Sequence, residues 1–329
     1  MQHGDSAFVT GGSGFIGGRL IGRLRGEGVR VRALARSDES AAKVEALGAE
    51  PVRADLDNET AMRDGAEGCR YAFHAAAKVE DWGDPADFER MNVDGTARAL
   101  RATRAAGVTR FVHVGTEAAL LAGDPLVGVD ESAPLRPDSK SLYPSTKARA
   151  ERLVRDASVA GFDTVVVRPR FVWGPGDTTV LPTIVQAVES GSFAFIGGGT
   201  HRTSTTHVDN AVEGMVLAAD QGVPGAAYFV TDGDPVVFRE WIARLLATRG
   251  MEPPDKSIPR PVAAALAATA ETAWRLLPLR GAPPLTRMTY WVTGLECTLD
   301  DSAARRDLGY HPVVTREQGL GHIAAESAG

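Results

Sequence analysis

Short runs of apolar, often β-branched residues alternate with longer amphipathic stretches through the first half of the chain. This alternation predicts a parallel sheet covered by helices on both faces. The predicted strands are residues 7–10, 29–35, 51–54, 71–75, 111–114 and 164–167. Helical patterns at 38–47, 85–106 and 144–160 lie between them and end at or close to a glycine, a common helix terminator. Six such units are typical of a Rossmann fold.

The alternation breaks down after Pro169. Residues 171–202 are rich in Gly, Pro and aromatic residues, and two more strand-like runs, 205–208 and 226–230, enclose a helical pattern at 212–219. We therefore expect the sheet to resume there. From about residue 235 the pattern is mostly helical and ends in an amphipathic segment at 316–325. The prediction is an α/β fold, a Rossmann doubly wound parallel sheet with a smaller, mostly helical C-terminal region.

The composition narrows the classes of protein that this fold could serve. Hydrophobic residues make up 43% and charged residues 24% of the chain, which is ordinary for a globular protein. A net charge of -6 provides no basic surface, so nucleic acid is not an expected partner. The two cysteines, Cys69 and Cys297, are too few for a disulfide framework or a thiolate metal site, and we predict no metal.

Two further features of the sequence bear on where in the cell the protein is located. The N-terminus does not read as a signal peptide, and the Ala-rich stretch 261–277 contains Glu271 and Arg275 and is too short to span a bilayer. We interpret that stretch as a helix. The expectation is a cytoplasmic protein without an integral membrane segment.

A glycine-rich loop follows the first predicted strand and opens a helix. The spacing Gly11-x-x-Gly14-x-x-Gly17 allows a tight turn, a close approach of the backbone to a pyrophosphate and close packing of helix on strand. Strand, spacing and helix together favour dinucleotide binding over a purely structural turn. The predicted contacts are Gly11, Ser13, Gly14, Phe15, Ile16 and Gly17.

The end of the second predicted strand bears on the choice of cofactor. NAD-selective Rossmann proteins place an acidic residue there for the ribose hydroxyls, whereas this chain reads Ala35-Arg36-Ser37. Arg36 could pair with a 2′-phosphate, and Ser37 could add a hydroxyl donor. We therefore predict NADP in preference to NAD; the alternative is that Arg36 is a solvated surface charge.

Tyr143 and Lys147 stand four residues apart, on one face of a helix that Pro144 is suited to start. The lysine charge would lower the phenol pKa from its ordinary value of ~10, and its ammonium could bind the nicotinamide ribose. Tyr143 could then act as an acid or base at a carbonyl oxygen. Alone, such a pair is also common on exposed helices; its position after the glycine loop and a fifth strand favours catalysis.

Polar residues also follow the fifth predicted strand, and ligands bind at strand carboxyl ends in open α/β sheets. Thr116 could bind the substrate oxygen and position Tyr143, or its hydroxyl could cap the loop. Glu117 could be a second acid or base, although an exposed glutamate at a strand end is the plainer interpretation. His113 is more typical of a packed strand residue than of a catalyst.

With the glycine loop, Thr116, Tyr143 and Lys147 in this order, the chain resembles the extended short-chain dehydrogenase/reductase family over nearly its whole length. The resemblance implies a catalytic triad of Thr116, Tyr143 and Lys147, and a structural or helix-orienting Asn92. It also implies an NAD(P)-binding Rossmann domain of residues 5–170 and about 203–232. The cofactor contacts that it implies outside the glycine loop are Asp55, Leu56, Ala75, Ala76, Ala77, Lys78, Tyr143, Lys147 and Pro169.

Within this family, the stretches 228–238, 308–312 and 317–320 are most similar to the 3β-hydroxysteroid dehydrogenase branch. That resemblance implies interconversion of a secondary alcohol and a ketone on a largely apolar substrate. Residues 171–202 and 233–329 would form the substrate-binding region. Arg170 could line the pocket and favour a polar or anionic group, or be a salt-bridged scaffold residue. The candidate substrate residues are Glu117, Arg170, Phe171, Trp173, Leu181 and Arg202.

Two other functions share these motifs. A nucleotide-sugar epimerase or dehydratase would use the same cofactor residues, but dehydratases of that type follow the threonine with an Asp-Glu pair, whereas this chain has Glu117-Ala118. A non-catalytic cofactor-binding protein would usually lack part of the triad, which is complete here. The family resemblance also implies a possible homodimer.

Overall fold

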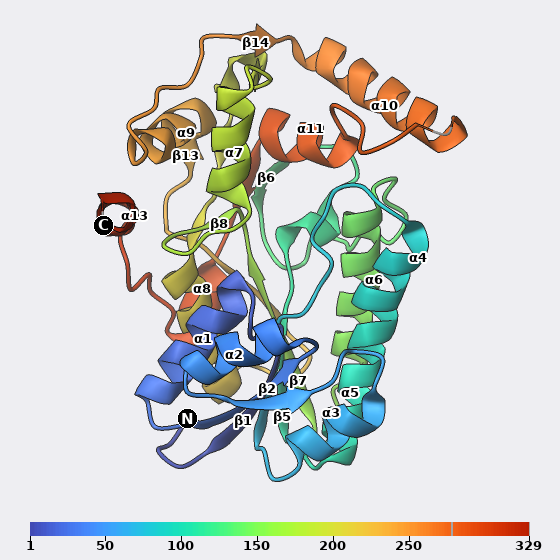
Figure 1. Ribbon diagram of the computed structural model, residues 1–329, viewed down its shortest axis with the longest axis vertical. Coiled ribbons are helices and arrows are strands. Elements are labelled where there is room, and N and C mark those ends of the chain that lie inside the picture. Colours follow the sequence, from blue (N-terminus) through green and yellow to red (C-terminus); the bar gives the residue numbers. More distant parts are fainter. Residues whose placement is uncertain (278, 329) are drawn as a thin grey trace.

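The computed structural model describes residues 1–277 and 279–328 and contains a seven-stranded parallel sheet (Figure 1). The strand order β12-β7-β5-β4-β1-β2-β3 extends the doubly wound Rossmann order by one strand. The fold predicted from the sequence is therefore confirmed. The strands are β1 (Ser6–Thr10), β2 (Arg30–Ala35), β3 (Glu50–Arg53), β4 (Tyr71–His74), β5 (Arg110–Val114), β7 (Asp163–Pro169) and β12 (Ala227–Val230).

Both faces of the sheet are apolar because successive side chains of a strand point to opposite sides. Ala7 and Val9 of β1 pack into one core and Phe8 packs into the other. The first face is covered by α1 (Phe15–Gly26), α2 (Asp38–Ala46), α8 (Val208–Gln221) and α12 (Ser302–Leu308). The second is covered by α3 (Glu59–Ala66), α5 (Gly95–Ala105) and α6 (Leu142–Asp156).

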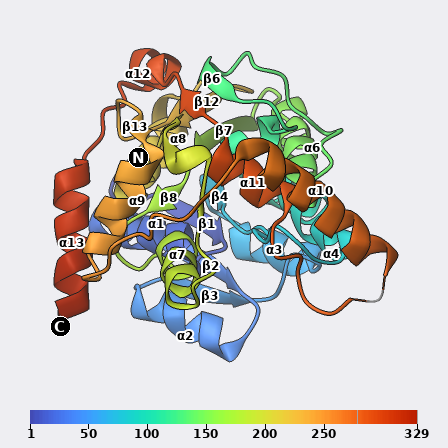
Figure 2. The same cartoon turned by 90° about the horizontal axis from the view of Figure 1, so that it is seen from above.

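The remaining elements gather at the carboxyl edge of the sheet, in the upper half of Figure 1 and facing the viewer in Figure 2. They include α7 (Val180–Glu189), α9 (Phe238–Ala247), α10 (Arg260–Leu276), α11 (Arg287–Gly294) and α13 (Arg316–Ala328). A four-stranded sheet supports them, made of β13 (Val236–Val237), β10 (Arg202–Thr203), β15 (Cys297–Leu299) and β6 (Leu126–Val129). The helical pattern of the sequence did not predict this second sheet, whose strands have four residues or fewer.

The strand predicted at 205–208 does not join the main sheet. Its central residues form β11 (Thr206–His207), which pairs with β8 (Val172–Trp173) in a separate two-stranded ribbon. The hydroxyl of Thr206 donates to the carbonyl of Val230 and accepts from the amide of Arg170. Side-chain hydrogen bonds thus fix this segment beside the sheet. A similar ribbon pairs β9 (Phe195–Ile196) with β14 (Ser257–Ile258).

The helix predicted at 85–106 is interrupted. It begins as α4 (Pro85–Phe88), passes through a π-helical segment at Glu89–Asp94 and continues as α5. Asn92 lies in the π segment, where its side chain binds both backbone groups of Lys78 and donates to the hydroxyl of Thr146. π segments are frequent beside functional sites. Here the segment ties the loop after β4 to the helix that carries Tyr143.

Among the described residues, no helix is long and apolar enough to cross a membrane. The Ala-rich stretch is helix α10 and turns Ala263, Ala267 and Ala270 inward, while Val262 and Leu276 are exposed.

Candidate active site

A cavity of about 1260 Å³ opens at the carboxyl edge of the parallel sheet and extends to α7, α9 and α11. Most of the residues predicted for cofactor and catalysis lie in its wall. Those are Gly11, Ser13, Gly14, Phe15, Ile16, Gly17, Arg36, Asp55, Leu56, Ala75, Ala76, Ala77, Thr116, Tyr143, Lys147 and Pro169. Among the predicted substrate residues, Glu117 and Phe171 also line the cavity.

The glycine loop forms the lower wall of the cavity. Gly11 has a φ of +74°, and a Cβ there would lie 2.6 Å from the amide nitrogen of Ala76. A Cβ on Gly17 would overlap the carbonyl oxygen of Gly11. Helix α1 begins after Gly14, which has no side chain to cap the first amides. The loop therefore offers a space that a Cβ would fill and free N–H donors at a helix N-terminus, which fits a pyrophosphate.

Arg36 follows the end of β2, and its exposed side chain lies at the cavity wall. Ser37, proposed above as an additional donor, serves a different purpose. Its hydroxyl accepts from the amide of Ser40 and caps helix α2, while its carbonyl accepts from Arg53. Ser40 lines the cavity in its place. The sequence offered the capping pattern as a clue, because serine is a preferred N-cap residue.

Tyr143 and Lys147 lie in the first turns of α6, which begins at Leu142, two residues earlier than the sequence predicted. Both side chains line the cavity and are almost fully buried. Burial and the charge of Glu117 raise the pKa of Tyr143 well above its ordinary value. Burial lowers the pKa of Lys147 to about 8. The expected lowering of the tyrosine pKa is therefore wrong for this structure, in which the phenol holds its proton at neutral pH.

Lys147 contacts a residue that sequence reasoning assigned to packing. Its ammonium donates to the carbonyl of Val114 at 2.8 Å and lies 3.2 Å from Nε2 of His113. Burial and the charge of Lys147 hold the pKa of His113 well below its ordinary value, so the imidazole is neutral and Nε2 can accept. His113 therefore holds the lysine in place, a role that its position on a buried strand did not reveal.

Thr116, Glu117 and Arg170 form a buried chain beneath Tyr143. The Thr116 hydroxyl donates to Oε2 of Glu117 at 2.8 Å, and Oε1 accepts from Nη1 of Arg170. Arg170 also donates to the hydroxyl of Thr203 and the carbonyl of Val292. Glu117 was expected to be exposed, but its exposed fraction is 4%. Arg170 takes the salt-bridged position, one of the two interpretations left open by the sequence.

Four more predicted site residues lie outside the cavity wall. They are Lys78, which was predicted to contact the cofactor, and the candidate substrate residues Trp173, Leu181 and Arg202. The ammonium of Lys78 pairs with Glu80 and lies over the ring of Phe88. Leu181 packs in an apolar cluster with Trp173, and Arg202 is exposed and donates to the carbonyl of Pro235. None of these four side chains lines the cavity.

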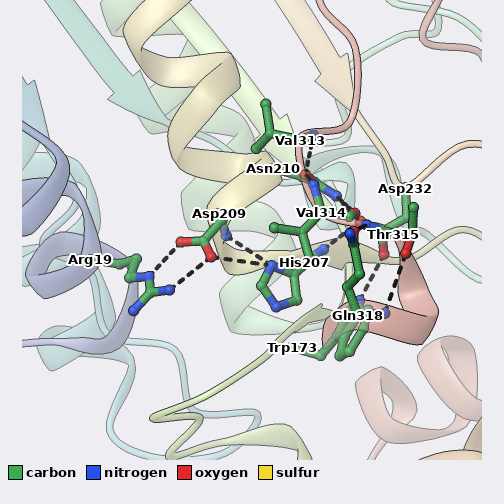
Figure 3. A network of polar contacts seen from close by, with 10 residues as sticks. All are labelled: Arg19, Trp173, His207, Asp209, Asn210, Asp232, Val313, Val314, Thr315 and Gln318. Atoms are coloured by element: carbon green, nitrogen blue, oxygen red, sulfur yellow. Dashed lines mark hydrogen bonds and ion pairs between the residues drawn. The ribbon is translucent and has the colours of Figure 1, made fainter. Parts of the chain in front are cut away.

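Trp173 belongs to a polar network that anchors the C-terminal segment (Figure 3). Its indole N–H donates to Asp232, which also accepts from the amide of His207 and the side chain of Asn210. Asn210 in turn accepts from the amides of Val313 and Val314. Trp173 is fully buried in this network. Through Asp232 and Asn210, Trp173 is connected to the C-terminal segment at Val313 and Val314.

The wall opposite the glycine loop is largely apolar, and its residues come from within 171–202 and 233–329, the stretches proposed from the sequence for substrate binding. Phe171, which has a φ of +46°, packs edge-on against Phe238 of α9. Strained non-glycine conformations of this kind cluster at functional sites. Other apolar residues of this wall are Val180, Ile184, Ala187, Phe193, Ile196, Ile242, Ile258, Leu266, Leu285, Met288 and Val292.

Fold and site together define an NAD(P)-dependent oxidoreductase of the short-chain dehydrogenase/reductase type. A model of the 3-beta hydroxysteroid dehydrogenase/isomerase family matches residues 8–260, and the chain belongs to this family.

Two relatives align over nearly the whole chain. The 4-hydroxy-2-methyl-3-oxo-4-farnesyl-3,4-dihydroquinoline-1-oxide ketoreductase of Stigmatella aurantiaca is 47% identical, over 95% of this chain and 94% of its own. The 2-alkyl-3-oxoalkanoate reductase of Stenotrophomonas maltophilia is 36% identical, over 97% and 98%. The structure of a double mutant of DesIV, a dTDP-glucose 4,6-dehydratase from Streptomyces venezuelae, shares the fold, with a TM-score of 0.76, 23% identity and coverage of 97% of this chain and 95% of that chain.

Proposed function

We propose that this protein is an NADPH-dependent ketoreductase whose ketone carries a long apolar chain on a neighbouring carbon. The observation that carries the proposal is the continuity of one cavity. It begins at the glycine loop, passes Tyr143 and Lys147, and ends in the apolar wall of α7, α9 and α11. A cofactor, a proton donor and an apolar substrate could therefore meet in a single space.

The residues of the site fit a reduction. The glycine loop and the N-terminus of α1 would hold the pyrophosphate, and Lys147 would bind the nicotinamide ribose. When bound, the reduced nicotinamide supplies a hydride for the carbonyl carbon. Tyr143, which keeps its proton at neutral pH, donates that proton to the carbonyl oxygen. The buried position of the phenol keeps water from competing for the proton.

The names of the two relatives share one chemical feature, which supports the choice of substrate. Each names a ketone whose neighbouring carbon carries a chain, farnesyl in one and alkyl in the other. The apolar wall of this chain, including Ile184, Phe193 and Met288, suits such a substituent. A nucleotide sugar would need cationic partners for its diphosphate, whereas the polar residues that the structure describes in this wall are hydroxyl-bearing, such as Thr183, Ser192 and Thr289, and none is basic. The apolar character therefore favours a ketoreductase over an epimerase or dehydratase.

The test compares 2-tetralone with 1-decyl-2-tetralone, which adds a chain beside the same carbonyl. We expect NADPH consumption and alcohol formation with both, and a kcat/KM at least about tenfold higher for the decyl compound. A buried chain of several methylenes is worth more than that, at ~0.8 kcal/mol for each methylene. If neither ketone is reduced to its alcohol, the proposal is contradicted. Equal rates would contradict the assignment of the apolar wall.

The preference for NADPH is expected to depend on Arg36. Its guanidinium is exposed at the cavity wall and suits bidentate contact with a 2′-phosphate. Arg36→Ala should raise the KM for NADPH by about tenfold or more, from loss of a charge-assisted contact, and leave the KM for NADH nearly unchanged. Arg53→Ala is a matched control, because Arg53 is bound to Ser37 and Asp38 nearby. A wild-type preference for NADH would refute the assignment.

Ketone reduction is expected to fall as the pH rises through about 8. Lys147 has a pKa of about 8, lowered by burial, so its ammonium is present below that pH and lost above it. The pKa of Tyr143 is raised, so the phenol stays protonated over the same range. The measurement is the pH dependence of kcat/KM, which reports groups of the free enzyme. In Lys147→Met the overall rate should be lower and the step near pH 8 absent; a step that persists would assign it to another group.

A further inference from the structure

The loop between β4 and α4, residues 75–84, connects the two halves of the cavity. Residues 75–77 line the cavity beside the glycine loop, in the half that fits the cofactor. Asn92 binds both backbone groups of Lys78 and so fixes the next part of the loop. From there the loop arches toward α11 (Figure 1). Asp81 thereby contacts a helix that begins about 200 positions later in the chain.

Asp81 accepts two hydrogen bonds from the start of α11. Its Oδ2 accepts from the hydroxyl of Thr286 at 2.8 Å and from the hydroxyl of Thr289 at 2.7 Å. Thr286 is the N-cap residue of α11 and is buried, so the contact lies inside the molecule. The helix dipole also favours a carboxylate at this end of a helix. Asp81 therefore fastens the start of α11 to the half of the molecule that carries the cofactor loop.

The loop also contacts α10, which is bound to α11. The guanidinium of Arg275 in α10 lies over the ring of Trp82, 5.6 Å from its centre. Glu271 of α10 accepts from the backbone amide and the guanidinium of Arg287 at the start of α11. The two helices thus form one unit, and the loop touches both of them. Of the two loop contacts, the hydrogen-bonded one is at the cavity, because Asp81 itself lines the wall.

The start of α11 supplies part of the apolar wall. Leu285 and Met288 line the cavity there. The other end of α11 is held separately, by the hydrogen bond from Arg170 to the carbonyl of Val292. Loss of the Asp81 side chain should therefore loosen the start of α11 relative to the cofactor loop and leave the rest of the helix attached.

We propose that Asp81 is a positioning residue that sets the preference of the enzyme for ketones with a long apolar chain. It holds the start of α11 in place, so that Leu285 and Met288 pack on the chain while the ketone lies beside the nicotinamide. A wall that shifts by even an ångström loses much of its dispersion contact with the chain. The proposal rests on the ketoreductase function above. Asp81 takes no part in the transfer of the proton or the hydride.

The ratio of kcat/KM between 1-decyl-2-tetralone and 2-tetralone tests this role. In Asp81→Ala we expect the ratio to fall by about fivefold or more, on the scale of a lost hydrogen bond. The dissociation constant of NADPH and kcat/KM for 2-tetralone should each change by less than about threefold, a small difference on the free-energy scale. Glu80→Ala is the matched control, since it removes a carboxylate of the same loop that pairs with Lys78, and it should keep the wild-type ratio.

The outcomes separate this role from the function on which it rests. An unchanged ratio in Asp81→Ala, including an equal loss for both ketones, overturns the role of Asp81 alone. A similar fall of the ratio in Glu80→Ala overturns it too, because the effect would belong to the loop and not to the contact with α11. A wild-type enzyme that reduces neither ketone overturns the ketoreductase function, and the role of Asp81 with it.

Thr286 tests the contact from the other side. Thr286→Ser keeps the hydroxyl and should keep the ratio, whereas Thr286→Val removes the hydroxyl and should lower the ratio. In Asp81→Ala the valine substitution should lower the ratio little further, because the two side chains act through one contact. Equal effects of Thr286→Val with and without Asp81 would overturn the proposal, since the threonine would then act only as the helix cap. If Asp81→Ala does not fold, the serine and valine variants decide.

Discussion

Replacing Tyr143 with Phe is expected to lower kcat for ketone reduction by about 10²- to 10⁴-fold, the usual contribution of a positioned general acid. The substitution removes one oxygen from a buried side chain and leaves its ring in the cluster with Phe88, Ala118 and Trp291. The loop that would hold the pyrophosphate lies elsewhere in the cavity wall. We therefore expect the NADPH dissociation constant, measured by the fluorescence of the bound cofactor, to change less than about threefold.

Tyr290→Phe is the matched control, since Tyr290 packs in the same cluster as Tyr143 and lies outside the cavity wall. That variant should retain most of its kcat. If Tyr143→Phe keeps more than a tenth of the wild-type kcat, the proton comes from another group. If kcat and NADPH affinity fall together, the loss of activity would reflect a distorted site and not the loss of the proton donor.

The sequence predicted the parts of the molecule that depend on local pattern. Strands 7–10, 111–114 and 226–230 were predicted because short apolar runs between helical patterns are typical of buried β-strands. The glycine loop was predictable for a similar reason, since Gly11 and Gly17 stand where a Cβ cannot be accommodated. The interval from Tyr143 to Lys147 put two side chains on one helical face and into one cavity.

Features that depend on contacts between distant segments could not be predicted. The partners of Arg170, which are Glu117, Thr203 and Val292, come from three parts of the chain, and no local pattern relates them. The raised pKa of Tyr143 follows from burial and from Glu117, whose own burial the sequence did not indicate. The apolar wall includes side chains of α9 and α11. The sequence pattern of these helices does not indicate which of their side chains face the cavity.

The helix that carries Tyr143 and Lys147 is held to the sheet by a buried ion pair. Glu151 of α6 accepts two hydrogen bonds from Nε of Arg168 at 2.9 and 3.2 Å and another from Nη2. Both side chains are almost fully buried, and Arg168 lies over the ring of Phe229. Arg168 precedes Pro169, which lines the cavity, so the pair connects the helix of the proposed acid to the strand end beside the cofactor space.

Removing one member of this pair is expected to destabilise the protein strongly. Glu151→Leu would leave the guanidinium of Arg168 buried without a counter-charge, which costs about 3 to 5 kcal/mol in the free energy of unfolding. The double variant Glu151→Leu, Arg168→Met replaces both charges with apolar groups and should recover most of that loss, because neither desolvated charge then remains. Urea unfolding of the wild type, both single variants and the double variant measures the coupling.

The same four proteins connect stability to the active site. Since Glu151 is four residues beyond Lys147 on α6, we expect Glu151→Leu to lower kcat as well, and the double variant to regain it together with its stability. A double variant as unstable as Glu151→Leu would mean that lost packing, and not the unpaired charge, causes the effect. Recovery of stability without recovery of kcat would show that the charges of the pair act on Lys147 directly, because the charge of Glu151 raises the lysine pKa against the effect of burial.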